Sequence, residues 1–148
     1  MEYADAIKKI RTILSKTATS DALQQVVGFL QGYFHHYNWV GLYLVQDEML
    51  VLGPWKGKEA TEHTRIPLGK GICGSAARSG RTEIVDDVSK DARYLSCFLS
   101  TRSEIVVPIK KGNIVVGEID IDADVPAAFT RQDTVFLEKV ADMLSKHI

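Results

Sequence analysis

The sequence predicts an α+β fold in which an antiparallel sheet carries helices on one face and a loop-covered pocket on the other. The hydrophobic pattern has a helical period towards both ends of the chain and alternates in between, as strands do. Neighbouring strand segments are separated by short turns, so they are expected to pair as antiparallel hairpins. The 148 residues, 45% hydrophobic and 25% charged, suit one globular domain spanning 1–148.

Three longer helices are expected, and the first two should pack on the sheet. Apolar side chains recur at helical spacing over residues 6–14. A Ser-Asp pair at residues 20–21 offers an N-cap for a second apolar stretch over residues 23–30. The last helix is expected to follow Thr130 as its N-cap, with Asp133 in the capping-box position three residues later.

The strands are expected in two hairpins and two shorter segments. Strand-forming residues predict strands at 37–45, 49–52, 64–66 and 82–85, and a hairpin over 103–124 that turns at 111–113. The first hairpin turns at 46–48, and a short helix is expected over 71–78. The irregular segments 53–71 and 86–100 are long for loops of a compact domain, so we expect them to cover the pocket.

The charge balance argues against nucleic acid and membranes as partners. The 18 Lys and Arg residues are balanced by 19 Asp and Glu residues, so no large positive field attracts phosphate groups. Apolar stretches such as 105–109 are far shorter than the roughly 20 residues that span a bilayer. The N-terminal pattern is unlike a secretion signal, so we expect a cytoplasmic protein.

The sequence motifs predict no metal and no cofactor. His35 and His36 are adjacent, His63 and His147 stand apart, and two cysteines are too few for a zinc array of Cys-x-x-Cys pairs. The sequence also lacks a phosphate-binding Gly-x-x-x-x-Gly-Lys-Ser/Thr loop and a dinucleotide-binding fingerprint. Chemistry is therefore expected from the side chains alone.

Acidic side chains follow one face of the last strand. A period of two places Val116, Glu118, Asp120 and Asp122 on one face and Val115, Ile119 and Ile121 on the other. Glu104 opens the neighbouring strand and is placed to join Asp120 and Asp122 across the hairpin. Carboxylates crowded in a partly buried site raise one another's pKa, which provides a proton donor near neutral pH. The alternative is a solvated face of the sheet.

Aromatic side chains alternate along the first strand. Tyr37, Trp39 and Tyr43 are expected on one face, with Gly41 leaving a gap between them. Aromatic walls around a glycine gap suit a small ligand. Packing of the same rings against the helices is the alternative, because aromatic side chains also dominate cores.

The two cysteines differ in their expected surroundings. Cys73 lies near the start of the short helix, where the helix dipole and free amides stabilise a thiolate. Cys97 lies in an irregular segment, where a nucleophile or redox centre has access to its substrate. The alternative for each is a buried, inert thiol, because free cysteine is among the most buried residue types.

Five motifs between Asn38 and Asp124 carry a specific resemblance. In chain order they are NWVGLYL, LGPWKGK, RIPLGKGICGSA, SEIVVPI and GEIDIDAD. Together they resemble the free methionine-(R)-sulfoxide reductases, an enzyme family with the GAF fold. Members of this family often carry a third cysteine ten residues before the GKGxCG cysteine, where this chain has His63.

The resemblance implies a role for seven residues. Cys97 is implied as the nucleophile and Cys73 as the resolving thiol, Glu104, Asp120 and Asp122 as substrate-binding and proton-transfer groups, and Trp39 and Tyr43 as pocket walls. It also implies reduction of free methionine (R)-sulfoxide through a Cys97–Cys73 disulfide, recycling by thioredoxin, and a possible homodimer. The alternative is a non-catalytic GAF module that binds a small molecule or regulates a partner.

Overall fold

The computed structural model describes residues 2–16, 18–95, 98 and 100–148, without the side chains of residues 19 and 20. Its elements follow the order α1 (Glu2–Lys16), α2 (Thr19–Tyr33), β1 (Trp39–Gln46), β2 (Met49–Lys56), β3 (Arg65–Pro67), α3 (Gly71–Ser79), β4 (Glu83–Val85), β5 (Ser103–Lys111), β6 (Ile114–Ala123) and α4 (Arg131–Ser145). A short 3₁₀ turn, Val88–Lys90, lies between β4 and β5.

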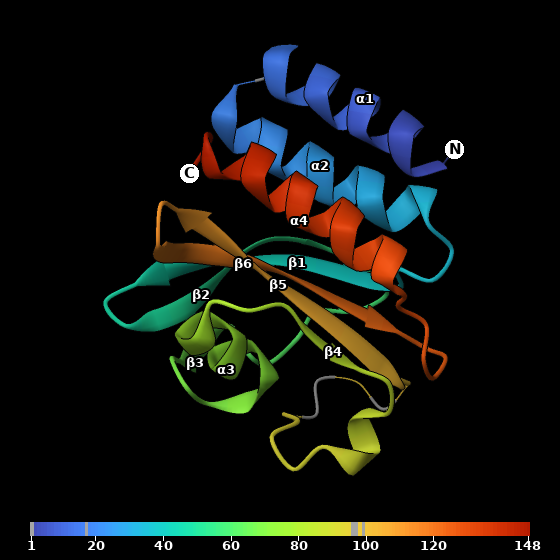
Figure 1. Cartoon of the computed structure of the whole chain (residues 1–148), viewed down its shortest axis with the longest axis vertical. Coiled ribbons are helices and arrows are strands. Elements are labelled where there is room, and N and C mark those ends of the chain that lie inside the picture. Colours follow the sequence, from blue (N-terminus) through green and yellow to red (C-terminus); the bar gives the residue numbers. More distant parts are fainter. Residues whose placement is uncertain (1, 17, 96–97, 99) are drawn as a thin grey trace.

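The strands form one antiparallel sheet in the order β3-β2-β1-β6-β5-β4. Helices α2 and α4 pack on one face of this sheet, while α3 packs against the opposite face (Figure 1). Helix α1 packs mainly on α2 and α4, so it forms an outer layer rather than lying mainly on the sheet as expected. The predicted α+β class is confirmed, with the second face covered by loops and by α3.

Alternation along the central strands separates two hydrophobic cores. Val40 and Leu42 of β1 and Ile119 and Ile121 of β6 are fully buried and belong to the core beneath the helices. Tyr43 belongs to a second core, on the α3 face of the sheet. The face predicted to carry the acidic side chains is therefore itself covered and largely closed to water.

The predicted start of the second helix is wrong by two residues. Helix α2 begins at Thr19 with Ala18 as the residue before it, so the Ser-Asp pair at 20–21 lies inside the first turn. An acidic side chain in that turn still interacts favourably with the positive end of the helix dipole. The Ser-Asp pair therefore indicates the start of the helix, but neither residue is its N-cap.

Strand β2 is longer than predicted, because it continues past Leu52 to Lys56. Gly53 and Pro54 suggested a loop, since proline has no amide hydrogen for a ladder. Two features accommodate them here. The register between β1 and β2 shifts at this point, and β3 pairs only with residues 49–51 of β2. Pro54 therefore occupies an irregular edge position, where strands tolerate proline.

A bulge reverses the predicted orientation of two valines in β6. Val115 pairs with Lys110 but Gly117 pairs with Ile109, which leaves Val116 as an extra residue. Val116 accordingly packs against the core beneath the helices, and Val115 against the second core. The assignment of Val116 to the acidic face was wrong, whereas the acids beyond Gly117 keep their predicted face.

Asp133 connects α4 to the residues that precede the sheet. The predicted capping box is confirmed, because Asp133 accepts from the Thr130 backbone and Thr130 accepts in return. The other carboxylate oxygen accepts from Tyr37 Oη at 2.6 Å and lies 3.0 Å from His36 Nε2. Burial alone would raise the pKa of Asp133, but hydrogen bonds from His36, Tyr37 and the Thr130 backbone lower it.

Replacing Asp133 by Ala should destabilise the fold by about 3 kcal/mol at pH 7, because the cap and the hydrogen bonds from Tyr37, His36 and Tyr3 to a charged carboxylate are lost. Since the pKa is lowered, this stabilisation is present above the ordinary value of 3.8 and is lost as the pH falls through the lower folded value. Urea unfolding curves test this, with Tyr37→Phe removing one of the bonds. A loss below about 0.5 kcal/mol, the size of an ordinary surface change, would contradict the role.

Candidate functional site

The structure gathers the predicted carboxylates in the second core. Glu104 on β5 is paired in register with Asp122 on β6, and Asp120 lies two residues before it on the same face. All three are buried, with 3–5% of each residue exposed. The alternative of a solvated acidic face is therefore wrong. Thr101 Oγ1 donates a hydrogen bond to Asp122 Oδ2 over a distance of 3.4 Å.

Cys73 lies directly against this cluster. Helix α3 begins at Gly71, so its first turn places the thiol over the sheet. The Cys73 Sγ atom lies 4.0 Å from Glu104 Oε2 and donates a weak hydrogen bond to it. Helix α3 and strands β5 and β6 thus bring together a thiol and carboxyl groups that are separated by 31 residues or more along the chain.

The electrostatics of Cys73 differ from the sequence prediction. Burial raises the pKa of the thiol well above its ordinary value, and the charges of Asp120, Glu118 and Glu104 raise it further. The prediction that the helix start stabilises a thiolate at Cys73 is therefore wrong. Desolvation and nearby carboxylates outweigh the helix dipole, whose contribution is typically below 1 kcal/mol.

The two aspartates of the cluster are held towards their neutral forms. Burial is the main cause that raises the pKa of Asp120, while hydrogen bonds involving Glu104 and Cys73 oppose it. Burial also raises the pKa of Asp122 well above its usual range, and the charge of Asp120 adds to this effect. Carboxyl groups in such surroundings can donate a proton near neutral pH, as anticipated from the sequence.

Glu118 belongs to the cluster, although the sequence analysis did not select it as a site residue. It is fully buried, and neither carboxylate oxygen has a hydrogen-bond partner among the described residues. Burial and the charge of Asp120 raise its pKa well above the ordinary value, with the Cys73 thiol opposing. The alternation of the sequence could have identified Glu118 as a member of the cluster, since it lies on the same strand face as Asp120 and Asp122.

Glu118→Gln should stabilise the protein at pH 8 by about 1–3 kcal/mol, because an unpaired buried carboxylate is costly. A raised folded pKa means that stability falls as the pH rises from the ordinary 4.5 towards the folded value. The wild type should therefore lose stability between pH 5 and 8 relative to Glu118→Gln. Urea unfolding at both pH values measures this. Equal pH slopes in the two proteins would be evidence against it, and exposed Glu62→Gln serves as the matched control.

Two cavities divide the predicted site residues between them. A small inner cavity of ≈ 20 Å³ is lined by Tyr43, Cys73, Glu104 and Asp120, together with Ile66, Ile72 and Leu95. A more open pocket of ≈ 380 Å³ is lined in part by Trp39, Asp122 and Phe98. The inner cavity and the outer pocket share no described lining residue, but Asp122 of the outer pocket lies two residues after Asp120 of the inner cavity on the same strand face.

The predicted face of the sheet is confirmed for Trp39 and Tyr43 and wrong for Tyr37. Tyr43 lies in the second core and donates a hydrogen bond from Oη to the His63 carbonyl oxygen at 2.7 Å. Trp39 lines the outer pocket and donates from Nε1 to the Glu59 carbonyl oxygen at 3.2 Å. Tyr37 lies in the core beneath the helices, because it precedes β1 and so does not follow the strand alternation.

The expected gap at Gly41 is already filled. A Cβ atom at Gly41 would lie 2.3 Å from the Trp39 ring, and one at Gly57 would lie equally close to it. The two glycines therefore make room for the indole, which also stacks against Trp55 at a centroid distance of 6.2 Å. Any substituent at either position would push the indole out of the wall of the outer pocket.

Cys97, the predicted nucleophile, lies outside the described residues. Two described residues lie close to it in the sequence. Leu95 lines the inner cavity, and Phe98 lines the outer pocket with its ring centroid 5.8 Å from that of Trp39. The role of Cys97 therefore rests on the sequence.

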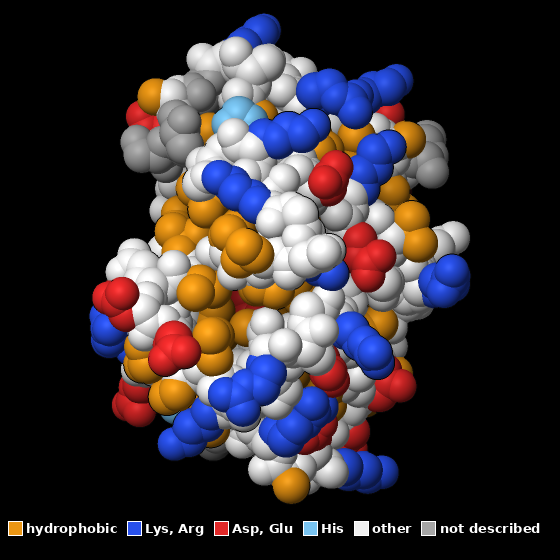
Figure 2. All heavy atoms as spheres, turned by 60° about the vertical axis from the view of Figure 1, so that its left-hand side comes forward, with side chains coloured by type: hydrophobic (Ala, Val, Ile, Leu, Met, Phe, Trp, Pro, Cys, Tyr) orange, Lys and Arg blue, Asp and Glu red, His pale blue; other side chains and the backbone are white. Residues whose placement is uncertain are grey.

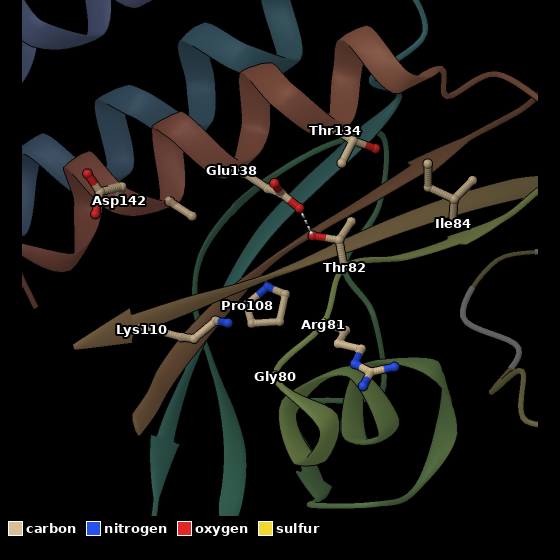
Figure 3. Close-up of a pocket in the computed structure, with 10 residues that line it drawn as sticks. Gly80, Arg81, Thr82, Ile84, Pro108, Lys110, Thr134, Glu138 and Asp142 are labelled. Atoms are coloured by element: carbon tan, nitrogen blue, oxygen red, sulfur yellow. Dashed lines mark hydrogen bonds between the residues drawn. The ribbon is translucent and has the colours of Figure 1, made fainter. Parts of the chain in front are cut away.

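A larger groove of the described chain lies elsewhere. It has a volume of ≈ 650 Å³ and runs between α4 and the β4–β5 edge of the sheet, where Thr82 hydrogen-bonds Glu138 at 2.7 Å (Figure 3). None of the buried acids or Cys73 lines it. Figure 2 shows basic and acidic side chains interspersed over one face of the molecule. We therefore place the candidate site at the cluster, where the reactive groups converge.

Within the described residues, no helix combines the length and the apolar character needed to cross a membrane.

Comparisons with known proteins agree with this fold. A GAF domain family model matches residues 18–148. The free methionine-R-sulfoxide reductase of Escherichia coli (strain K12) is 33% identical over 145 residues, covering 97% of this chain and 87% of that protein. The structure of the Neisseria meningitidis free methionine-R-sulfoxide reductase in complex with its substrate has 33% identity and a TM-score of 0.91, covering 98% and 87% of the two chains. The type II free methionine-R-sulfoxide reductase from Thermoplasma acidophilum has 36% identity and a TM-score of 0.84, covering 87% and 91%. The chain therefore belongs to the GAF domain family and, within it, to the free methionine-R-sulfoxide reductases.

Proposed function

We propose that this protein reduces free methionine (R)-sulfoxide to methionine, with Cys97 as nucleophile and Cys73 as resolving thiol. The observation that carries the proposal is the buried cluster of Glu104, Asp120 and Asp122 beside the Cys73 thiol. Such a cluster supplies both functions that the reaction needs from the protein besides the nucleophile, namely a cation-binding group and a proton donor.

The first chemical step transfers oxygen from the substrate to a cysteine. The Cys97 sulfur attacks the sulfoxide sulfur while the sulfoxide oxygen accepts a proton, which makes the sulfur electrophilic. The products are methionine and a sulfenic acid on Cys97, so the sulfoxide is reduced and the cysteine is oxidised by two electrons. Attack by Cys73 then forms the disulfide and releases the oxygen as water.

The positions of the acids suggest how they divide the work. Glu104 and Asp120 line the inner cavity with Cys73, so they are closest to where the two thiols must meet. We assign proton donation to this pair. Asp122 lines the outer pocket instead of the inner cavity. The outer pocket is large enough for an amino acid, so we assign Asp122 to the substrate ammonium. A peptide-bound methionine sulfoxide lacks that ammonium group, which accounts for specificity towards the free amino acid.

Substrate binding must connect the two cavities. The inner cavity of ≈ 20 Å³ accommodates about one water molecule, so the sulfoxide end cannot enter it without movement of its walls. Leu95 lines the inner cavity and Phe98 lines the outer pocket. The two residues flank the predicted nucleophile in the sequence. We infer that their side chains shift when substrate binds, with Trp39 and Tyr43 providing the apolar walls.

The test is turnover of purified protein with separate R and S epimers of free methionine sulfoxide and dithiothreitol. The expected result is reduction of the R epimer only, and no reduction of an N-acetylated or peptide-bound sulfoxide. Failure to turn over either free epimer would sink the enzyme proposal. Saturable binding without turnover would instead favour the non-catalytic GAF module, the alternative considered from the sequence.

Recycling, assembly and location complete the proposal. We infer thioredoxin as the reductant of the disulfide, a reaction between dithiol pairs that suits a reducing compartment such as the cytoplasm. The family's third cysteine is replaced by His63, so the cycle must run on the two thiols of this chain. One domain spanning 1–148 and a homodimer remain predictions, and light scattering on the purified protein measures the latter.

A further inference from the structure

The inner cavity has the donor set of a metal site. One potential ligand atom each from Cys73, Glu104 and Asp120 lies within 4.8 Å of the others, and all three side chains line the cavity. Its volume of ≈ 20 Å³ holds one ion or one water molecule but no organic ligand. A thiol and two carboxyl groups thus surround a space of ionic size.

An independent observation supports a cation there. Asp120 is only 4% exposed, lines the cavity, and its Oδ1 atom has no hydrogen-bond partner among the described residues. The neighbouring Glu118 is fully buried, with both oxygens likewise unpartnered. Neither residue belongs to an ion pair within the described chain. A buried oxygen with no donor and no counter-charge is costly, and a cation bound in the cavity would satisfy the Asp120 oxygen that lines it.

We propose that the inner cavity binds a single Zn²⁺ ion through the Cys73 thiolate and the Glu104 and Asp120 carboxylates. A mixed sulfur and oxygen donor set favours zinc, since Mg²⁺ and Ca²⁺ take oxygen ligands only. Tetrahedral zinc would place these atoms about 3.3–3.5 Å apart, so the three ligands must close by about 1 Å. Binding releases the Cys73 proton to solvent, and no electron is transferred.

Zinc in this position blocks the reductase cycle. It occupies the resolving thiol, the pair of acids assigned to proton donation, and the space that the sulfoxide end must enter. Only this inhibition rests on the proposed function, because the binding of zinc depends on the three ligands and not on any turnover. Zn²⁺ is therefore a second ligand of the site, held by the two acids assigned to proton donation and not by Asp122, which is assigned to the substrate ammonium.

The test uses Co²⁺ as a spectroscopic probe in place of Zn²⁺, with the protein reduced by a phosphine that does not bind metal. The wild type should develop a thiolate-to-cobalt absorption band that saturates at one equivalent and is displaced by Zn²⁺. Cys97→Ser should retain the band, because Cys73 is then the only cysteine in the chain. Cys73→Ser should lose it, and Asp120→Asn should weaken cobalt binding at least tenfold. No band in the reduced wild type, or an undiminished band in Cys73→Ser, would overturn the site.

Thermal unfolding keeps the test decisive if a variant folds poorly. Zn²⁺ at a hundredfold excess over its Kd should raise the Tm of Cys97→Ser by about 8 °C, and it should leave the Tm of Cys73→Ser unchanged. Exposed Glu62→Gln should respond as the wild type does. A band in a protein that reduces neither epimer would support the metal site and remove the proposed function. Turnover of the R epimer without any cobalt band would support the proposed function and overturn the metal site.

Discussion

Cys97→Ser is expected to abolish reduction of free methionine (R)-sulfoxide. A serine hydroxyl is a far weaker nucleophile towards the sulfoxide sulfur than a thiolate, and it forms no sulfenic acid. We expect a loss of roughly 10⁴-fold or more in the single-turnover rate. The measurement is methionine released per chain when enzyme exceeds substrate, with a sulfenic acid probe applied in parallel. No probe adduct should form on the variant.

Cys73→Ser separates the first step from the second. Because the resolving thiol acts only after oxygen transfer, this variant should release one methionine per chain at a rate within a few-fold of the wild type. Its Cys97 sulfenic acid should persist and react with the probe, whereas turnover linked to thioredoxin should stop. Equal loss of the first turnover in both variants would reverse or void the assignment. Melting curves of both variants control for folding, because Cys73 is packed in the second core.

Loss of a buried carboxyl group should have the second largest effect on turnover. Glu104→Gln and Asp120→Asn remove the proposed proton donors, so kcat should fall by about 10²–10⁴-fold with a smaller change in KM. Asp122→Asn removes the proposed partner of the ammonium, so its main effect should be a raised KM. Steady-state kinetics with the R epimer distinguish the two patterns. The exposed Asp142→Asn variant on α4 should behave as the wild type.

Two results would contradict this division of roles. A raised KM without loss of kcat in Asp120→Asn would move proton donation to another group. Unchanged kinetics in Asp122→Asn would show that the ammonium binds elsewhere. Because burial raises the pKa of both aspartates, replacement by asparagine should stabilise the fold at pH 8 rather than unfold it, so lost activity cannot be attributed to lost structure.

Local periodicity explains why the acidic face of β6 and the capping box could be predicted from the sequence. Alternation along β6 placed Glu118, Asp120 and Asp122 on one face, and the hairpin brought Glu104 opposite Asp122. The capping box at Thr130 was likewise readable, because it depends on residues three apart. Such features involve contacts within one turn or across one hairpin, where the chain itself fixes the geometry.

Several features of the site depend on contacts that no local pattern contains. The bulge at Val116, the turn of Tyr37 away from the strand face, and the filling of the Gly41 gap by Trp39 all follow from packing between distant segments. The pKa of Cys73 is the sharpest case. Its position in the helix favours a thiolate, but burial beside three carboxylates reverses the effect.

The sequence by itself determined the α+β class, the acidic face of β6, and the family to which five ordered motifs point. The tertiary structure alone decided that these acids are buried, that both Glu118 oxygens have no hydrogen-bond partner among the described residues, and that Asp120 and Glu104 line an ion-sized cavity with Cys73. The physical reason is that side-chain alternation is set by neighbouring residues. Burial and the charge around a group are set instead by which distant elements, here α3, β5 and β6, pack against one another.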